Sequence, residues 1–364
     1  MRKHLKKFFW FSLFTKRTVT SNLNCTNKRT INLNRIMNSF GRKFRVSIFG
    51  ESHGELIGIV VDGVPAGIAL SEADLNADLD RRKAGAKGTT PRKEADEPHI
   101  VSGVFNGYTT GAPLTVVFRN TNTRSGDYSN LVTQPRPGHA DFVAREKWHG
   151  YSDYRGGGHF SGRITLGIVA AGAIAKKILG GTVKIESRIL EIGGFTEPAD
   201  IEAAVQSAVD SQDSLGGIIE CTASGVPVGW GEPFFDSVEA VLSHALFSIP
   251  AVKGVEFGAG FAAARMRGSQ HNDDIVASDG TTRTNNAGGI NGGISNGNPV
   301  VFRVVVKPTS SIASAQQTFN FADGKVEPLV VRGRHDACIA LRVPVVVEAM
   351  AAIVLCDFSM ISAD

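Results

Sequence analysis

A stretch of seventeen residues occurs twice in the chain, and this repeat constrains the fold more than any other feature. Residues 51–67 read ESHGELIGIVVDGVPAG and residues 213–229 read DSLGGIIECTASGVPVG, with seven identities and no gap. Such self-similarity indicates two related halves, each with a turn, an apolar strand and a Gly-Val-Pro bend. The informative mismatch is His53, which is replaced by Leu215 in the second copy.

Residues 1–36 differ from everything after them. They hold nine Lys or Arg residues and no Asp or Glu, so the formal net charge of +4 becomes −5 for the remaining residues. A secretory signal, an organellar transit peptide and an upstream region translated ahead of a true start at Met37 all remain open, and the last is slightly favoured. In each case we expect a leader outside the fold, followed by a single domain over residues 37–364, and removing the leader should leave the activity intact.

The secondary-structure pattern after the leader mixes strands and helices without regular alternation, which predicts an α+β fold. A helix should open with Ser71 as N-cap and Asp74 at N3 and stop near Gly85, and another should open at Asp236 and end before Pro250. Residues 163–179 predict a helix buried on all sides, and a last helix should cover residues 344–358. The expected strands, rich in β-branched residues, are 44–49, 56–62, 99–105, 113–119, 183–190, 217–223 and 299–306.

Composition excludes several classes of protein. The four cysteines are scattered without a CxxC pair, which argues against a disulfide scaffold and a metal site. The basic charge lies in the leader, so it gives no argument for nucleic-acid binding. No apolar run reaches the roughly 18 residues of a membrane span.

Four of the nine histidines lie close to glycine-rich turns, where backbone can approach a ligand: His53, His139, His159 and His335. Histidine changes charge near neutral pH, so these are the natural candidates for acid–base chemistry. The segment 50–54, GESHG, formally matches the nucleophile elbow G-x-S-x-G. An elbow leads into a helix, however, and the β-branched run that follows predicts a strand, so a serine hydrolase is not indicated.

Two glycine-rich loops suggest contact with an anion or a cofactor. Residues 156–163, GGGHFSGR, lead directly into the buried helix, where free backbone N–H groups and an arginine favour phosphate. Residues 286–297 form a second such loop, and residues 307–311, KPTSS, bring an ammonium and three hydroxyls together. Neither a dinucleotide fingerprint nor a Walker A sequence is present.

Taken together, several long segments in one order resemble the chorismate synthase family, from about Phe40 to the C-terminus. The segments that carry the resemblance are 44–54 (FRVSIFGESHG), 62–65 (DGVP), 136–141 (RPGHAD), 153–158 (DYRGGG), 225–227 (GVP), 231–233 (GEP), 248–254 (SIPAVKG), 286–297 and 333–336 (GRHD).

The resemblance implies a β-α-β sandwich with internally duplicated halves, a homotetramer and one reduced FMN per active site. It also implies the 1,4-anti elimination of phosphate and a C6 proton from 5-enolpyruvylshikimate 3-phosphate, without net redox change. We expect a cytoplasmic enzyme, or an organellar one if the leader is a transit peptide. It should depend on an external flavin reductase, although the sequence leaves open whether the chain reduces its own FMN with NADPH.

The resemblance also assigns roles. His53 should assist the leaving phosphate, His139 should place a cation near the flavin, and Asp336 should take part in removing the ring proton. The substrate, with two carboxylates and a phosphate, should bind Arg45, Arg82, Lys87, Arg163 and Arg334, since arginine offers charged bidentate donors. The expected FMN contacts are His159, Phe160, Ser161, Pro250, Ala251, Gly292, Lys307, Pro308, Thr309, Ser310, Ser311 and Arg334.

Three positions depart from the family pattern. His159 stands where the family usually has Arg, Ile164 replaces an acidic residue, and Ala337 replaces the proline after Asp336. The loop after Arg82 is one residue shorter than in many members. Two other functions stay open at this stage: an FMN oxidoreductase with net electron transfer, and a silent relative that only binds the ligand.

Overall fold

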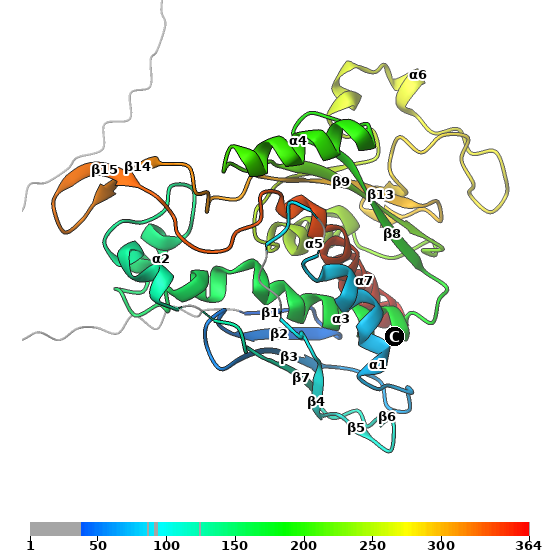
Figure 1. Ribbon diagram of the computed structural model, residues 1–364. Helices are drawn as coiled ribbons and strands as arrows, with labels where there is room; N and C mark the ends of the chain where they lie inside the picture. Colours follow the sequence, from blue (N-terminus) through cyan, green and yellow to red (C-terminus); the bar gives the residue numbers. More distant parts are fainter. Residues whose placement is uncertain (1–37, 86, 91–93, 124, 364) are drawn as a thin grey trace, which may run out of the picture. The chain divides into compact units, whose positions relative to one another are not determined.

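Two antiparallel sheets enclose a layer of helices in the computed structural model, which describes residues 38–85, 87–90, 94–123 and 125–363 (Figure 1). The first sheet has the order β1 (Ser39–Phe40), β2 (Arg45–Gly50), β3 (Leu56–Asp62), β7 (Leu114–Arg119) and β4 (His99–Ser102). The second has the order β10 (Val252–Phe257), β13 (Val300–Val306), β9 (Gly217–Ser224) and β8 (Lys184–Ile192). This arrangement is the β-α-β sandwich expected from the sequence.

Four helices form the middle layer: α1 (Ala73–Arg82), α3 (Thr165–Ile178), α5 (Val238–Phe247) and α7 (Pro344–Ile361). Helix α3 packs on the first sheet, α7 packs on the second, and the two helices pack against each other. Their backbones approach closely, since a β-carbon at Gly172 would lie 2.3 Å from Cβ of Ala349. Small residues at this crossing therefore allow α3 and α7, one from each half, to pack closely against each other.

The halves repeat the same order of elements. The chain runs β2, β3, α1, β4, β7, α3 in the first half and β8, β9, α5, β10, β13, α7 in the second. The sheet order repeats as well, because β3 lies between β2 and β7 and β9 lies between β8 and β13. Even the register is kept: Ile59 pairs with Ile48 and Val116, and Cys221, its counterpart, pairs with Ser187 and Phe302.

The Gly-Val-Pro bends are also equivalent. Gly63 has a φ of 87° and Gly225 a φ of 77°, which is the left-handed region that favours glycine. A β-carbon at Gly63 would meet the carbonyl of Lys43, two residues before β2, and one at Gly225 would meet the carbonyl of Thr182, two residues before β8. The repeated sequence therefore encodes one strand and its bend, used twice.

The expected strands are present, and several boundaries are corrected. The strand expected over residues 99–105 is interrupted at Gly103 into β4 and β5 (Val104–Phe105), because Gly103 has a φ of 87°. Helix α1 begins at Ala73 rather than after Ser71, although Asp74 accepts hydrogen bonds from both N and Oγ of Ser71, and it ends at Arg82. The N-cap of α5 is Ser237, whose hydroxyl accepts from the N–H of Ala240, not Asp236.

The buried helix expected over residues 163–179 is α3, whose first turn is replaced by a 3₁₀ turn, η3 (Gly162–Ile164). The last helix, α7, continues three residues beyond the expected end to Ile361. It is long and apolar enough to cross a membrane by length and composition, which corrects the expectation from apolar runs. However, 78% of its apolar window is buried, as in the core helix of a soluble protein. The leader predicted over residues 1–36 lies outside the described residues.

The remaining elements lie at the periphery or around the site. Helix α4 (Pro198–Asp210) packs on β8 and was not predicted, nor was the hairpin of β14 (Gln316–Asn320) and β15 (Lys325–Leu329). The others are β6 (Tyr108–Thr109), α2 (Asp141–Lys147), α6 (Gly268–His271), β11 (Ile290–Asn291), β12 (Ile294–Ser295), η1 (Ser125–Val132), η2 (Arg155–Phe160), η4 (Phe234–Asp236), η5 (Gly260–Arg265) and η6 (Ile339–Arg342).

Candidate active site

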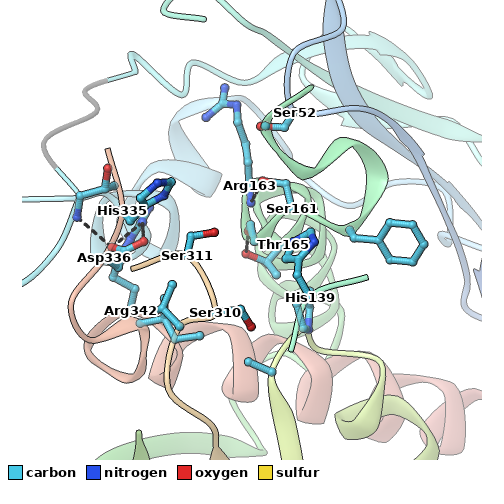
Figure 2. Close-up of a pocket in the computed structure, with 18 of the residues that line it drawn as sticks. Ser52, His139, Ser161, Arg163, Thr165, Ser310, Ser311, His335, Asp336 and Arg342 are labelled. Carbon is cyan, nitrogen blue, oxygen red and sulfur yellow. Dashed lines mark hydrogen bonds and ion pairs between the residues drawn. The ribbon is translucent and has the colours of Figure 1, made fainter. Parts of the chain in front are cut away.

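A cavity of about 610 Å³, called here the main cavity, lies where loops of the two halves converge. The turn after β2 and the glycine-rich segment before α3 line it from the first half, and the loops after α5 and β13 line it from the second. In the view of Figure 2, Asp336 and Arg342 lie on one side, His139 and Thr165 lie on the other, and Ser310 and Ser311 lie between them. The site thus belongs to the interface that the duplication creates.

The lining is strongly cationic. Among the described residues, seven Lys and Arg side chains line the main cavity against three carboxylates, Glu94, Asp96 and Asp336. The seven are Arg82, Lys83, Arg136, Arg163, Lys307, Arg334 and Arg342. Residues 37–364 carry a net charge of −5, so such a local excess of positive charge selects for a ligand with several negative charges.

Two of the arginines predicted to bind substrate share one buried carboxylate. Nη1 of Arg163 donates to Oδ1 of Asp96 at 2.7 Å, and Nη1 of Arg82 lies 3.7 Å from Oδ2 of the same residue. Nε of Arg163 also donates to Oδ1 of Asn120 at 2.5 Å. Nη2 of Arg163 is buried with no hydrogen-bond partner among the described residues, so it is available to a ligand in the cavity.

Arg82 is held by the start of α3. Its Nε donates to Oγ1 of Thr165 at 3.0 Å and its Nη2 donates to the carbonyl of Gly162 at 2.8 Å. Burial, together with the charge of Arg342, lowers the pKa of Arg82 to about 9, so the guanidinium remains charged at neutral pH. Cations that repel one another in this way are stabilised when an anion enters.

His53 is buried at the tip of the turn after β2 and lines the main cavity. Its ring meets the ring of Tyr128 edge-on, with centroids 5.2 Å apart. The segment of η2 passes directly beside it, and the N–H of Ser52 donates to the carbonyl of Gly158 at 3.1 Å. The equivalent residue, Leu215, packs against the hydrophobic core. Only the first copy of the repeat therefore brings a titratable group to the cavity.

His139 lies in a tight cluster with Arg136 and Asp141. Its Nδ1 is 2.6 Å from Oδ1 of Asp141, and Arg136 donates to both carboxylate oxygens of Asp141 at 2.7 Å. Burial, reinforced by the charges of Arg136 and Lys307, lowers the pKa of His139 against the opposing hydrogen bond to Asp141. Burial therefore disfavours the cation expected at this position in the ligand-free chain.

Asp336 reaches the cavity from the loop that precedes η6. Its Oδ1 accepts the N–H of Thr90 at 2.9 Å, and Nη1 of Arg342 donates to its two oxygens at 3.2 and 3.3 Å. Nε of Arg342 donates to the carbonyl of Arg82, which ties this carboxylate to the end of α1. On the same loop, Nη2 of Arg334 donates to Oδ1 of Asn122 at 3.1 Å.

The loop after β13 supplies hydroxyls and a cation. Nζ of Lys307 donates to Oγ of Ser310 at 2.5 Å, and Nη1 of Arg136 donates to Oγ of Ser311 at 2.8 Å. Oγ1 of Thr309 is buried and has no hydrogen-bond partner among the described residues. Ser214, the repeat counterpart of Ser52, holds this loop by donating to the carbonyl of Thr309 at 2.8 Å.

The structure brings most of the predicted residues together. His53, His139 and Asp336 line the main cavity, as do Arg82, Arg163, Arg334, Phe160, Ser161, Pro250, Ala251 and residues 307–311. Ala251 adopts a φ of 76°, a conformation that costs a residue with a β-carbon free energy and that is often found at functional sites.

Four predicted residues lie outside the cavity in the single chain. Arg45 is exposed and pairs with Asp62, and the ammonium of Lys87 points to Glu202, 3.8 Å away. Nδ1 of His159 donates to the carbonyl of Gly50 at 2.8 Å, and Gly292 lies in the turn between β11 and β12. For Arg45, Lys87 and His159 a local contact explains the position.

Sequence reasoning missed six charged residues that line the cavity or contact its lining: Lys83, Glu94, Asp96, Arg136, Asp141 and Arg342. Arg136 and Asp141 flank His139 within the motif of residues 136–141 (RPGHAD), and their charges next to a candidate histidine could have indicated them as site residues. Asp96 and Arg342 gave no such signal, because they are brought to the cavity by tertiary structure alone.

Comparison with known proteins agrees with this geometry. The family model described as chorismate synthase matches residues 44–360. A chorismate synthase of Chitinophaga pinensis is 61% identical over 325 residues, which cover 89% of this chain and 97% of that protein. The chain belongs to the chorismate synthase family.

Other relatives give the same result. Chorismate synthases of Dehalococcoides mccartyi and Korarchaeum cryptofilum are 47% and 46% identical, and the matches cover 89% and 88% of this chain and 96% and 97% of theirs. A crystal structure of chorismate synthase superposes with a TM-score of 0.66 at 28% identity, covering 89% of this chain and 93% of that chain. The chain is therefore a chorismate synthase-type carbon–oxygen lyase, and its α+β sandwich is the chorismate synthase fold.

Proposed function

We propose that the main cavity converts 5-enolpyruvylshikimate 3-phosphate to chorismate by 1,4-anti elimination of phosphate and the C6 proton. The observation that carries the proposal is the excess of seven Lys and Arg over three carboxylates in one cavity that also contains three histidines of the family motifs, His53, His139 and His335. A substrate with two carboxylates and a phosphate satisfies this charge, and the elimination needs one group to assist the leaving phosphate and another near the ring proton.

Arg82, Arg163 and Arg334 anchor the substrate. All three are fixed by contacts with neighbouring residues before any ligand binds, so little side-chain entropy is lost on binding. The unpartnered Nη2 of Arg163 supplies a donor that only a ligand can satisfy. Arg45 and Lys87, which face away from the cavity, contribute less to affinity in a single chain.

The hydrogen-bond donors of the loop after β13 fit FMN. The buried Oγ1 of Thr309 lacks a partner, and Lys307, Ser310 and Ser311 add a cation and hydroxyls of the kind that bind a flavin phosphate or ring oxygens. A β-carbon at Gly138 would lie 3.3 Å from Oγ of Ser310, so the absence of a side chain leaves room at this wall. When bound, reduced FMN supplies electron density as phosphate departs and recovers it afterwards, with no net redox change.

His53 and Asp336 act on opposite ends of the elimination. His53, as imidazolium, donates a proton to the leaving phosphate oxygen as the C–O bond breaks, which neutralises the developing charge. Asp336 is the carboxylate that takes part in removing the C6 proton. Its hydrogen bonds from Arg342 and Thr90 hold the carboxylate in one orientation.

The assembly and cellular context follow the family. We propose a homotetramer, supported by large exposed apolar side chains such as Phe234 and Phe235, which are 88% and 92% exposed in the single chain. Sedimentation equilibrium tests this directly. We propose an external reductase as the source of reduced flavin and the cytoplasm as the location.

Phosphate release under anaerobic conditions tests the function. The chain is incubated with 5-enolpyruvylshikimate 3-phosphate, with and without chemically reduced FMN, and inorganic phosphate is measured. Phosphate should appear only when reduced FMN is present with the substrate, and not with oxidised FMN or without flavin. Release that is independent of flavin, or no release with reduced FMN, contradicts the proposal.

A further inference from the structure

We propose that Asp141 is a positioning residue that fixes His139 in the tautomer with its proton on Nδ1, leaving Nε2 as an acceptor for a ligand in the main cavity. No part of this proposal is needed to explain the family's reaction. The proposal concerns the contact between Asp141 and His139. The effect expected on turnover rests on the proposed function, whereas the tautomer expected for His139 does not.

The geometry around Nδ1 decides the tautomer. Nδ1 lies 2.6 Å from Oδ1 of Asp141 and 3.0 Å from Nη2 of Arg136. A carboxylate oxygen can only accept and a guanidinium nitrogen can only donate, so Nδ1 cannot satisfy both. The shorter contact requires a proton on Nδ1, because otherwise two lone pairs would face each other at 2.6 Å. Nη2 of Arg136 loses nothing, since it donates to Oδ1 of Asp141 at 2.7 Å.

Asp141 is itself rigidly placed. Its side chain is 7% exposed and that of Arg136 is 3% exposed. Nε of Arg136 donates to Oδ2 at 2.7 Å, and the backbone N–H of the same residue donates to Oδ2 at 3.0 Å. Although burial acts in the opposite direction, these hydrogen bonds and that of His139 hold the pKa of Asp141 well below its ordinary value. The acceptor next to His139 is therefore always ionised near neutral pH.

Arg136 also links this cluster to the loop after β13. Nη1 of Arg136 donates to Oγ of Ser311 at 2.8 Å, in the loop that also presents Lys307 and Thr309. Among the described residues none hydrogen-bonds to Nε2 of His139, and this atom would be 3.4 Å from a β-carbon at Gly157. Nε2 is thus the nitrogen left for a ligand. A histidine ordered in this way by a carboxylate presents one nitrogen with one defined role, as in other carboxylate–histidine pairs.

A neutron structure of the ligand-free enzyme tests the tautomer. Crystals are exchanged into D₂O at about pH 8, above the ordinary histidine pKa of about 6.5, and the deuterium positions on His139 are refined. Deuterium on Nδ1 alone is expected. Deuterium on Nε2 alone, or on both nitrogens, overturns the proposal without any assumption about the reaction.

The variant Asp141→Asn separates positioning from packing. Its carboxamide keeps the shape but can donate to Nδ1, so the neutron structure of the variant should show deuterium gained at Nε2. Turnover should fall about 10–100-fold, the usual effect of losing a partner that orients a functional histidine. Glu220→Gln is the control, because Glu220 is likewise a carboxylate held by arginine, here Arg188 and Arg303, but it lies outside the cavity; its turnover should match wild type.

The outcomes distinguish the two proposals. If Asp141→Asn retains deuterium on Nδ1 alone, or turns over at the rate of the control, Asp141 does not position His139. If the wild-type enzyme shows the expected tautomer but releases no phosphate with reduced FMN, the proposed function fails and the tautomer stands.

Discussion

Gly156 lies against the imidazole of His53 so closely that no side chain fits between them. A β-carbon at Gly156 would be 1.9 Å from Nδ1 of His53 and 2.9 Å from Oγ of Ser52. Gly156 also adopts a φ of 61°, which residues with a β-carbon rarely adopt. The triple glycine therefore shapes the pocket around His53.

Substitution of Gly156 by alanine should displace His53. We expect a loss of about 1–3 kcal/mol in the free energy of unfolding from the positive φ and a fall of about 100-fold in turnover from the misplaced ring. Gly268→Ala is the control, since its added β-carbon has no neighbour within 4 Å and its φ is not positive. Urea unfolding and steady-state turnover measure both effects, and equal turnover in the two variants would remove the link between Gly156 and His53.

Removal of the His53 imidazole should slow the chemical step rather than cofactor binding. His53→Ala should reduce turnover by about 10²–10⁴-fold, the usual loss for a general acid. The affinity for reduced FMN should change little, because the donors that fit FMN, Lys307 and residues 309–311, belong to the loop after β13 and not to the turn that carries His53. Turnover and an anaerobic FMN titration are compared, and a parallel loss of FMN affinity would argue against the role given to His53.

Asp336→Asn keeps the size of the side chain and removes the carboxylate. Loss of the C6 proton should become slower, so substrate deuterated at C6 should show a larger isotope effect in this variant than in wild type. Thr90 and Arg342 contact the wild-type carboxylate from two sides, so the variant should still fold. An unchanged isotope effect together with slow turnover would place Asp336 outside the proton-removal step.

A buried carboxylate should make the stability of the fold depend on pH. Glu348 of α7 accepts from Arg81 of α1 at 2.7 Å, from Lys176 of α3 at 3.1 Å and from Ser187 of β8 at 2.7 Å. Burial acts in the opposite direction, but these hydrogen bonds hold its pKa below the ordinary value of 4.5. A carboxyl with a lowered pKa in the folded state stabilises that state above the ordinary value, and the contribution is lost as the pH falls.

The variant Glu348→Gln should therefore unfold more easily at neutral pH, by about 3 kcal/mol, with the difference shrinking as the pH falls below about 4.5. Urea unfolding at a series of pH values measures this. Glu202→Gln, at a position that is 74% exposed, should change little at any pH. A difference between wild type and Glu348→Gln that does not vary with pH would show that Glu348 is not ionised in the folded state.

The repeat predicted much of the fold because it encodes a strand and a bend whose conformations are local. Gly63 and Gly225 take the same positive φ for the same reason, and the strand pairings follow from the alternation of apolar residues. Helix α4 and the β14–β15 hairpin escaped prediction, since neither has a strong apolar pattern and each is stabilised by what it packs on. The segment η2 contains three glycines with positive φ, residues 156–158, which a linear pattern does not show.

The site was predictable where one motif holds a whole contact, and not where the contact joins distant segments. His139 was found from its motif, but its lowered pKa depends on burial and on charges from Arg136 and Lys307. The Arg163–Asp96 pair joins positions 67 residues apart, and Arg342 is placed by donating to the carbonyl of Arg82, 260 residues away. Arg45 and Lys87 were expected as ligands from their motifs alone, and the fold gives each an acidic partner instead.

The ratio of chorismate formed to reduced FMN consumed tests the central claim most directly. The enzyme is given a limiting amount of chemically reduced FMN and excess 5-enolpyruvylshikimate 3-phosphate without oxygen, and chorismate, phosphate and the flavin absorption spectrum are followed together. An elimination without net redox change predicts many chorismate molecules per flavin, one phosphate for each, and a flavin that is still reduced at the end. Oxidation of one FMN for each product molecule, or phosphate released without chorismate, would contradict it.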